Sequence, residues 1–341
     1  MIVYIQQGRN LSLTKILKGN SALSRKLSLL LPELTPAVTK NNALLAPPLT
    51  NHYGLVGTAF DYLLRFEIQK RYTVEVRGWI AEAALARLLG SALGKKTGPS
   101  LTASDLKKIE RITGSTESRV ITGNSALKDK NGNIPPKLIP VLWKQGNALV
   151  GKTKSILHKY LKSRDESWIE RLCESSLKLA KLDSIFRAGF VDIPLDDVDQ
   201  EDVEDLRNLL KIVPWSTLDP YLGQRTLLNP SFRDYSRLMC GADADMIAGS
   251  LLIDIKTVKA MDQRKYAAQL VGYGILANKH QQEDNSFPKV TMLGLYYSRF
   301  GILQTIQFKD VIRNPSYQEA EQDLLEASKV HSFTNILSEL K

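Results

Sequence analysis

Four charged side chains in the C-terminal third of the sequence have the types and spacing of a hydrolytic site: Asp243, Asp245, Asp254 and Lys256. Side chains alternate between the two faces of a strand, so Asp243 and Asp245 share one face, as do Asp254 and Lys256. The Ala-Gly-Ser sequence at residues 248–250 predicts a tight turn between two strands. Two adjacent strands would then bring two or three carboxylates and an ammonium group to one side of a sheet.

Clustered carboxylates raise each other's pKa, so proteins tolerate them mainly where a cation neutralises them. Hard divalent cations prefer oxygen, and Mg²⁺ often takes one or two carboxylates together with water and substrate phosphate. A lysine two residues from a ligating carboxylate can hold an attacking water and stabilise charge on a phosphate. The cluster therefore predicts metal-assisted hydrolysis of a phosphodiester. The alternative is an ordinary β-hairpin with a charged solvent face.

A helical pattern over residues 264–278 follows these strands. Gln269 and Tyr273 are four residues apart and Tyr266 stands three residues before Gln269, so all three share one helical face. On a helix directly after the Asp-x-Lys strand, the glutamine and the tyrosine would lie over the site, where they could bind a phosphate or orient the lysine. Plain amphipathic packing is the alternative for the two tyrosines.

The series Asp245, Asp254-Ile-Lys256 and Gln269-x-x-x-Tyr273 resembles the PD-(D/E)XK nuclease superfamily. It is most similar to the branch with RecB-type nuclease domains, lambda exonuclease and CRISPR-associated exonucleases, which is marked by a helical glutamine-x-x-x-tyrosine element. The resemblance implies metal ligation by Asp245 and Asp254, catalysis by Lys256, and orientation of phosphate or lysine by Gln269 and Tyr273. It also implies the backbone carbonyl of Ile255 as a further metal ligand and Asp243 as a third acid.

A second match lies nearer the N-terminus. The family often has a glycine followed four residues later by a histidine, on a helix beside the site. Gly57 and Asp61 have this spacing, with aspartate in the histidine position. Aspartate can also ligate a metal, so the resemblance implies that Asp61 joins the site and that the helix at residues 54–72 packs on the nuclease core. A solvent-facing helical aspartate is the alternative.

A rival motif runs from Gly146 to Thr153 and matches G-x-x-x-x-G-K-T, the pattern of a phosphate-binding loop. Such a loop needs a strand before it and a helix after it, which the flanking residues could supply. Leu149 and Val150 are bulky where a loop must wrap closely around phosphates, and no strand–helix alternation follows. We therefore expect the start of a helix preceded by a loop, with its lysines adding to a basic surface.

The composition of the 341-residue chain is that of a globular protein, with 43% hydrophobic and 24% charged residues, which excludes disordered, collagen-like and disulfide-scaffold classes. The net charge of +10 is unevenly spread. Residues 1–190 carry 30 Lys and Arg against 14 Asp and Glu, whereas residues 191–210 carry one Arg against eight acids. A basic surface of this size favours a polyanionic partner, and a well-solvated basic protein is the alternative.

The two cysteines, Cys173 and Cys240, cannot form a four-thiolate zinc or iron–sulfur site, and the four histidines are scattered. We therefore expect any metal to be held by oxygen. The apolar runs are too short for a membrane-spanning helix, and Met1–Arg9 is too short and polar for a secretory signal. These observations predict a cytoplasmic protein with reduced, buried thiols and no membrane association.

The expected fold is α/β, with a restriction-endonuclease-like mixed-sheet core flanked by helices and a large helical insertion or N-terminal lobe. The expected division is an N-terminal segment (1–53), a helical, basic lobe (54–229) and the nuclease core (230–341). An acidic stretch at 192–205 is interpreted as a solvated helix face plus linker, or as a phosphate mimic that shields a basic groove. The remaining expectations are a strand at 2–5, helices within 54–93, 101–112 and 149–189, a loop-rich segment at 113–140, strands at 238–247, 251–258, 290–297 and 302–308, and a helix after Pro315.

The function expected from these residues and this resemblance is a Mg²⁺- or Mn²⁺-dependent nuclease that acts on nucleic acid, with DNA favoured. The resemblance suggests defence against foreign DNA or recombination and repair, and any motor would be a separate subunit. Two alternatives are a nuclease-fold protein that binds nucleic acid without cutting it, and a P-loop ATPase that uses Gly146–Thr153.

Overall fold

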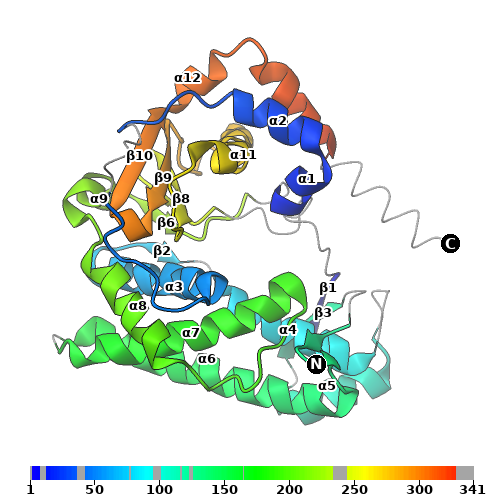
Figure 1. The fold of residues 1–341 in the computed structure, drawn as a ribbon. Coiled ribbons are helices and arrows are strands. Elements are labelled where there is room, and N and C mark those ends of the chain that lie inside the picture. The colour runs from blue at the N-terminus through cyan, green and yellow to red at the C-terminus, as the bar shows by residue number, and fades with distance from the viewer. Residues whose placement is uncertain are drawn as a thin grey trace. The chain divides into compact units, whose positions relative to one another are not determined.

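The computed structural model describes residues 2–7, 13–36, 43–76, 78–94, 101–115, 117–122, 126–163, 165–232 and 244–327. The chain divides into two compact units (Figure 1). Unit 1 comprises residues 1–10, 49–66 and 78–210, and unit 2 comprises residues 11–48, 67–77 and 211–341. The N-terminal 77 residues therefore contribute to both units in turn.

Unit 2 is built on a six-stranded mixed sheet with the order β10-β9-β8-β7-β6-β2. The β8–β9 and β2–β6 pairs are parallel, and the other neighbours are antiparallel. The strands are β2 (Glu75–Val76), β6 (Thr226–Leu228), β7 (Met246–Ala248), β8 (Leu251–Lys256), β9 (Met292–Tyr297) and β10 (Ile302–Gln307). The predicted α/β class with a mixed sheet flanked by helices is confirmed.

The β7–β8 hairpin turns at Gly249 and Ser250, as predicted from the sequence. Gly249 has φ 57, a left-handed conformation that glycine adopts without steric cost. The turn has two residues, with glycine first, which fixes the register of the two strands. Met246 consequently pairs with Ile253, and Ala248 pairs with Leu251.

Helix α11 (Gln263–Glu283) covers one face of this sheet, and α1 (Leu13–Gly19) and α2 (Ser21–Leu29) pack against α11 (Figure 1). The Asp262 side chain caps α11 by accepting a hydrogen bond from the Lys265 N–H at 3.2 Å. The buried core of unit 2 joins Leu27 of α2, Val271 of α11 and Leu293 of β9. Among the described residues of unit 2, the other helical segments are α9 (Trp215–Leu222), η2 (Ser298–Phe300), α12 (Phe308–Ile312) and residues 317–327.

Unit 1 is mainly helical. Its helices are α3 (Tyr53–Arg71, whose end enters unit 2), α4 (Ile80–Leu93), α5 (Ala103–Thr113), η1 (Pro136–Leu138), α6 (Ile139–Lys162), α7 (Ser167–Ala188) and α8 (Gln200–Lys211). Helices α4, α6 and α7 pack together around Gly146 of α6. A Cβ on Gly146 would lie 2.8 Å from a methyl carbon of Leu85 and 3.0 Å from one of Leu182, so the missing side chain permits this close approach.

Two small sheets complete unit 1. The strands β1 (Ile2–Gln7) and β3 (Glu117–Thr122) pair in parallel, and β4 (Lys128–Asp129) pairs with β5 (Gly132–Asn133). The expected N-terminal strand is thus confirmed. The expectation that residues 113–140 are loop-rich is wrong in part, because β3, β4 and β5 lie there. Pairing with a strand more than 110 residues away orders β3, and the sequence around β3 does not reveal this.

Several element boundaries also differ from the expectations. The helical stretch at 54–93 is interrupted by β2, and the stretch at 149–189 is two helices, α6 and α7. The strand expected at 238–247 overlaps β7, and its residues up to 243 lie outside the described part of the chain. Within that part, no helix combines the length and the apolar character needed to cross a membrane.

Candidate active site

Asp254 and Lys256 lie near the end of β8, with their side chains on the sheet face that α11 covers. The side chains are 4% and 13% exposed, and the Lys256 ammonium nitrogen lies 2.6 Å from Asp254 Oδ2. Strand alternation places Ile253 and Ile255 on the opposite face, as expected from the sequence. A buried ion pair of this kind is costly to desolvate, so it is a weak argument for stability and a stronger one for function.

Asp245 lies beside Asp254 because the hairpin register continues one step beyond the Met246–Ile253 pair. Its carboxylate oxygen Oδ2 accepts a hydrogen bond from the Ile255 backbone N–H at 2.6 Å. This bond holds the Asp245 carboxylate against the end of β8. The structure therefore brings together the two carboxylates that the sequence predicts as metal ligands.

The electrostatics of the pair are those of crowded, buried carboxylates. Burial and, to a smaller extent, the charge of Asp245 raise the pKa of Asp254, the Lys256 ammonium opposes both effects, and the net result is a pKa of about 7. Burial alone would lower the pKa of Lys256, but the carboxylates of Asp254 and Asp245 outweigh it, so the net shift is upward. Lys256 therefore stays protonated while Asp254 ionises reluctantly near neutral pH.

Helix α11 supplies the glutamine and the tyrosine. The Lys256 ammonium group donates to Gln269 Oε1 at 3.1 Å, and Gln269 Nε2 donates to the Tyr273 hydroxyl oxygen at 2.9 Å. The Tyr273 ring is buried and packs 6.2 Å from the ring of Phe232. The structure thus joins the strand lysine to the helical glutamine, and the glutamine to the helical tyrosine.

Three further side chains border Lys256 or Gln269. The Lys256 ammonium lies 4.8 Å from the centroid of the Tyr266 ring, a cation–π contact. Thr14 of α1 receives a long hydrogen bond, 3.4 Å, from Gln269 Nε2. Tyr297 is paired with Lys256 in the β8–β9 register, and its buried hydroxyl finds no hydrogen-bond partner among the described residues. The sequence indicates Tyr266 by helical spacing, but it gives no signal for Thr14 or Tyr297.

The residues present fit a hard divalent cation. Asp245 and Asp254 offer carboxylate oxygens, and Ile255, whose carbonyl is the further predicted ligand, stands between Asp254 and Lys256. The described residues contain no group of three or more His, Cys, Asp or Glu that could hold a metal. Mg²⁺ does not require one, since one or two carboxylates with water and substrate phosphate suffice. Asp243, the predicted third acid, lies outside the described residues.

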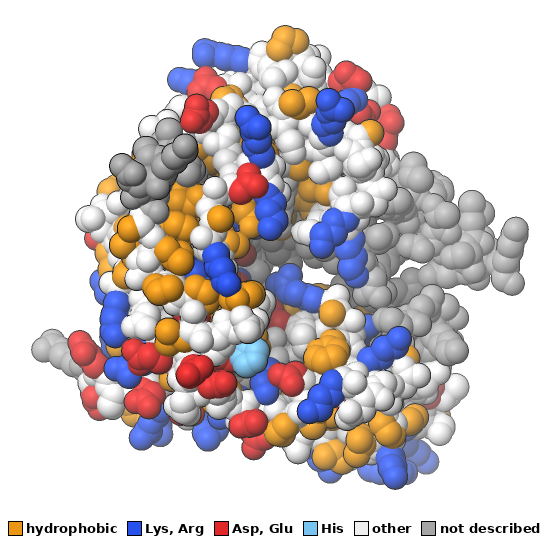
Figure 2. Space-filling model, in the orientation of Figure 1, with side chains coloured by type: hydrophobic (Ala, Val, Ile, Leu, Met, Phe, Trp, Pro, Cys, Tyr) orange, Lys and Arg blue, Asp and Glu red, His pale blue; other side chains and the backbone are white. Residues whose placement is uncertain are grey.

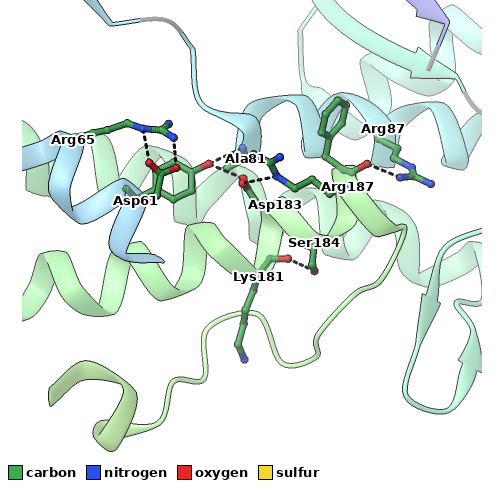
Figure 3. Close-up of polar contacts among 10 residues, drawn as sticks. Asp61, Arg65, Ala81, Arg87, Lys181, Asp183, Ser184 and Arg187 are labelled. Atoms are coloured by element: carbon green, nitrogen blue, oxygen red, sulfur yellow. Dashed lines mark hydrogen bonds and ion pairs between the residues drawn. The ribbon is translucent and has the colours of Figure 1, made fainter. Parts of the chain in front are cut away.

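Asp61, the other predicted ligand, belongs to unit 1. The Arg65 guanidinium, one helical turn later in α3, donates to both of its carboxylate oxygens (Figure 3). The side chain is largely shielded, at 16% exposed, so the alternative of a solvent-facing aspartate is wrong. Its role as a metal ligand stays a prediction, as does the packing of residues 54–72 on the nuclease core.

A buried polar cluster follows Asp61 in unit 1 (Figure 3). The Tyr62 hydroxyl donates to Asp183 Oδ1 at 2.6 Å and accepts from the Ala81 N–H at 3.1 Å. Burial raises the pKa of Asp183, against the opposing charge of Arg187. Because each of these groups has a partner within unit 1, the cluster is explained as the link between α3, α4 and α7.

The phosphate-loop alternative is wrong. Residues from Gly146 to Thr153 lie inside α6, where Gly146 packs against two leucines and Thr153 is buried, donating to the Leu149 carbonyl at 2.9 Å. A continuous helix directs its N–H groups along its own axis, so none is available to cradle a phosphate. The expectation of a helix beginning here is also wrong, since α6 begins at Ile139.

The acidic stretch at 192–205 is only partly a solvated face. Asp202, in the first turn of α8, is 1% exposed; the Thr50 hydroxyl donates to it at 2.5 Å, and His52 Nδ1 lies 2.8 Å away. Asp192 pairs with Lys181 at 3.2 Å. A cavity of about 550 Å³ within unit 1 is lined by His52, Lys181, Asp192 and Asp202. The buried Asp202 and the half-exposed Asp192 are therefore structural partners of neighbouring polar groups.

Comparisons of the chain with protein-family models, with curated proteins and with solved structures found no match. The resemblance to the nuclease superfamily accordingly rests on the five motif residues and on the contacts that join them.

Proposed function

We propose that this chain is a Mg²⁺- or Mn²⁺-dependent nuclease that hydrolyses phosphodiester bonds in nucleic acid, with DNA favoured. The observation that carries the proposal is the position of Lys256, whose ammonium contacts both Asp254, at 2.6 Å, and Gln269, at 3.1 Å. Strand and helix residues that are spaced as in the PD-(D/E)XK nucleases thus form one connected set. A restriction-endonuclease-like fold for unit 2 is part of the same proposal.

Asp245 and Asp254 would hold the divalent ion, with the Ile255 carbonyl as a further ligand. Such an ion supplies positive charge that lowers the pKa of water and screens the scissile phosphate. Its binding would also relieve the repulsion that raises the pKa of Asp254. This gives a reason for keeping two carboxylates together in a buried place.

Lys256 already donates to Asp254 and Gln269, so its third N–H would be directed to the attacking water. Its positive charge would stabilise the negative charge that grows on a non-bridging oxygen of the phosphate in the transition state. The water oxygen forms a new bond to phosphorus while the bond to one sugar oxygen breaks. One water proton passes to solvent, and the departing sugar oxygen takes up a proton to become a hydroxyl. Gln269 holds the lysine in place, and Tyr273 holds Gln269.

The test is cleavage of supercoiled plasmid and of labelled oligonucleotides in buffer with Mg²⁺ or Mn²⁺. We expect cleavage by the natural protein, none in EDTA, and none by Lys256→Ala. Lys309→Ala, which removes an exposed lysine elsewhere in unit 2, is the matched control and should cleave normally. Equal cleavage by Lys256→Ala would overturn the proposal. Metal-independent binding without any cutting would favour the nuclease-fold binding protein instead.

A further inference from the structure

Helix α6 carries a one-sided basic face that the proposed active site does not use. The helix has five lysines and no Asp or Glu over its 24 residues. Its buried residues, which include Leu142, Val150 and Leu157, face the interior of unit 1. Figure 2 shows Lys and Arg side chains along the lower edge of the view, where Figure 1 draws α6 and α7.

Helical geometry aligns four of these lysines, Lys144, Lys152, Lys159 and Lys162, which we call the α6 stripe. Lys144 and Lys162 are 18 residues apart, or five full turns, so they point in the same direction about 27 Å apart. Lys152 and Lys159 lie within about 80° of that line, on the side opposite the buried face. All four are exposed.

The charge of the stripe is not neutralised within the described residues. Lys154, on the edge of α6, pairs with Glu82 at 2.5 Å. The four stripe lysines form no ion pair in the described part of the chain. Lysines are usually interspersed with acids on a solvated helix, so an acid-free row over five turns is a feature that a polyanion complements.

The centre of the stripe is open to close approach. Between the lysines the surface consists of small or polar residues such as Ala148, Gly151 and Ser155. Apart from its chain neighbours and the nearby backbone of α6 itself, Gly151 has no heavy atom within 4 Å of the position a Cβ would take. A phosphate backbone could therefore lie on the helix between the lysines.

Trp168 of α7 extends the basic surface. Lys159 lies 5.8 Å and Arg171 4.8 Å from the centroid of its indole ring, both over the ring. Because two cations already contact the ring, Trp168 serves to hold them in position rather than to stack on an unpaired base. A straight, stiff row of cations also suits a stiff polyanion better than a flexible one.

We infer that the α6 stripe is a docking surface for the sugar–phosphate backbone of double-stranded nucleic acid. The inference goes beyond the proposed hydrolysis, because it concerns residues of unit 1 that take no part in bond cleavage. It assigns part of the chain's net charge of +10 to one helix face with a defined partner. Contacts of this type bind without reading the base sequence.

The test measures binding of a short labelled duplex in EDTA, so that no cleavage intervenes, over a range of salt concentrations. Lys144, Lys152, Lys159 and Lys162 are all changed to Ala. Because each lost phosphate contact lowers the slope of log affinity against log salt by about 0.9, the slope should fall by about 3 to 4. The control changes Lys18, Lys107, Lys130 and Lys309 to Ala, which removes the same charge from scattered exposed positions, and its slope should stay close to that of the natural protein.

An arginine version of the four stripe positions, which keeps the charge, should bind like the natural protein. The inference is overturned if the stripe and control variants lose the same affinity, if the stripe variant binds normally, or if single strands or anionic vesicles bind as tightly as the duplex through the same lysines. If the protein binds duplex through the stripe lysines but never cleaves it, only the proposed nuclease activity is refuted. If it cleaves nucleic acid but its duplex binding does not depend on the stripe lysines, only this inference is refuted.

Discussion

The Lys256 ammonium donates to Gln269 Oε1 across 3.1 Å, and this bond joins the end of strand β8 to the second turn of helix α11. The lysine has three donors, one directed to the helix and one to Asp254. Its position is therefore fixed by two different elements of unit 2, which is how a group that must meet a phosphate is held in a productive geometry.

Replacing Gln269 by Ala should slow cleavage while leaving metal binding intact. The change removes the acceptor that fixes Lys256 and the donor that reaches Tyr273. Because a misplacement of about 1 Å can cost about 10²-fold in rate, we expect a fall of this order in kcat. The matched control is Gln282→Ala, an exposed glutamine on the same helix, which should retain the full rate. Equal rates for the two variants would show that Gln269 does not position Lys256.

The raised pKa of Asp254 predicts how stability depends on pH in the metal-free protein. The pKa is about 7 in the folded state against an ordinary value of 3.8, so the folded state holds the proton more tightly. Asp254 therefore contributes fully to the free energy of unfolding below about pH 4, and this contribution is lost as the pH rises to about 7. Asp254→Asn should remove this part of the pH dependence, as measured by thermal unfolding in EDTA at a series of pH values.

Added Mn²⁺ should reverse the trend, since the ion binds the ionised carboxylate. A ligand at a concentration of 100 times its Kd raises the free energy of unfolding by about 2.7 kcal/mol. Because Mn²⁺ binds the ionised form of Asp254, the rise in Tm should be clear at pH 8 and small at pH 6. Asp254→Asn should abolish the rise at both pH values. A Mn²⁺ shift of equal size in that variant would place the ion elsewhere in the protein.

The two glycines of the Gly146–Thr153 segment should respond in opposite directions to substitution, because they lie on opposite faces of α6. Gly146→Val would press against Leu85 and Leu182 and should destabilise by about 1–3 kcal/mol. Gly151→Ala, with open space around it, should stabilise by about 0.5–1 kcal/mol through helix propensity. Urea unfolding measures both changes. Destabilisation by Gly151→Ala, or a midpoint raised by ATP, would contradict the helical assignment of this segment.

The parts of the site that could be predicted are those whose geometry is local. Alternation along β8 puts Asp254 and Lys256 on one face, the glycine turn at Gly249 fixes the hairpin register, and the four-residue spacing of Gln269 and Tyr273 defines a helical face. Each relationship spans fewer than thirty residues, so periodicity alone carries it. For Gln269 the sequence left two roles open, binding a phosphate or orienting Lys256, and the structure shows its contact with Lys256.

Contacts between distant segments could not be predicted. Thr14 reaches Gln269 across 255 positions, and β1 pairs with β3 across more than 110. Such pairings depend on loop closure and on tertiary packing, which no local pattern records. The segment Gly146–Thr153 shows that a local pattern can also mislead. Its spacing matches a phosphate loop, but it lies in a helix that packs against leucines of α4 and α7.

The acidic stretch yields a final prediction that separates a structural role from a phosphate-mimic role. Asp202 is buried and accepts from Thr50, with His52 beside it, so Asp202→Ala should destabilise the protein by about 1–3 kcal/mol. Asp196 is exposed, and Asp196→Ala should change stability by less than about 0.5 kcal/mol. Each variant loses one negative charge, and its affinity for duplex should rise by no more than this loss of charge explains. If both variants bound nucleic acid much more tightly and kept full stability, the stretch would act as a shield over a basic groove, because removing a competing anion frees the cations it covers.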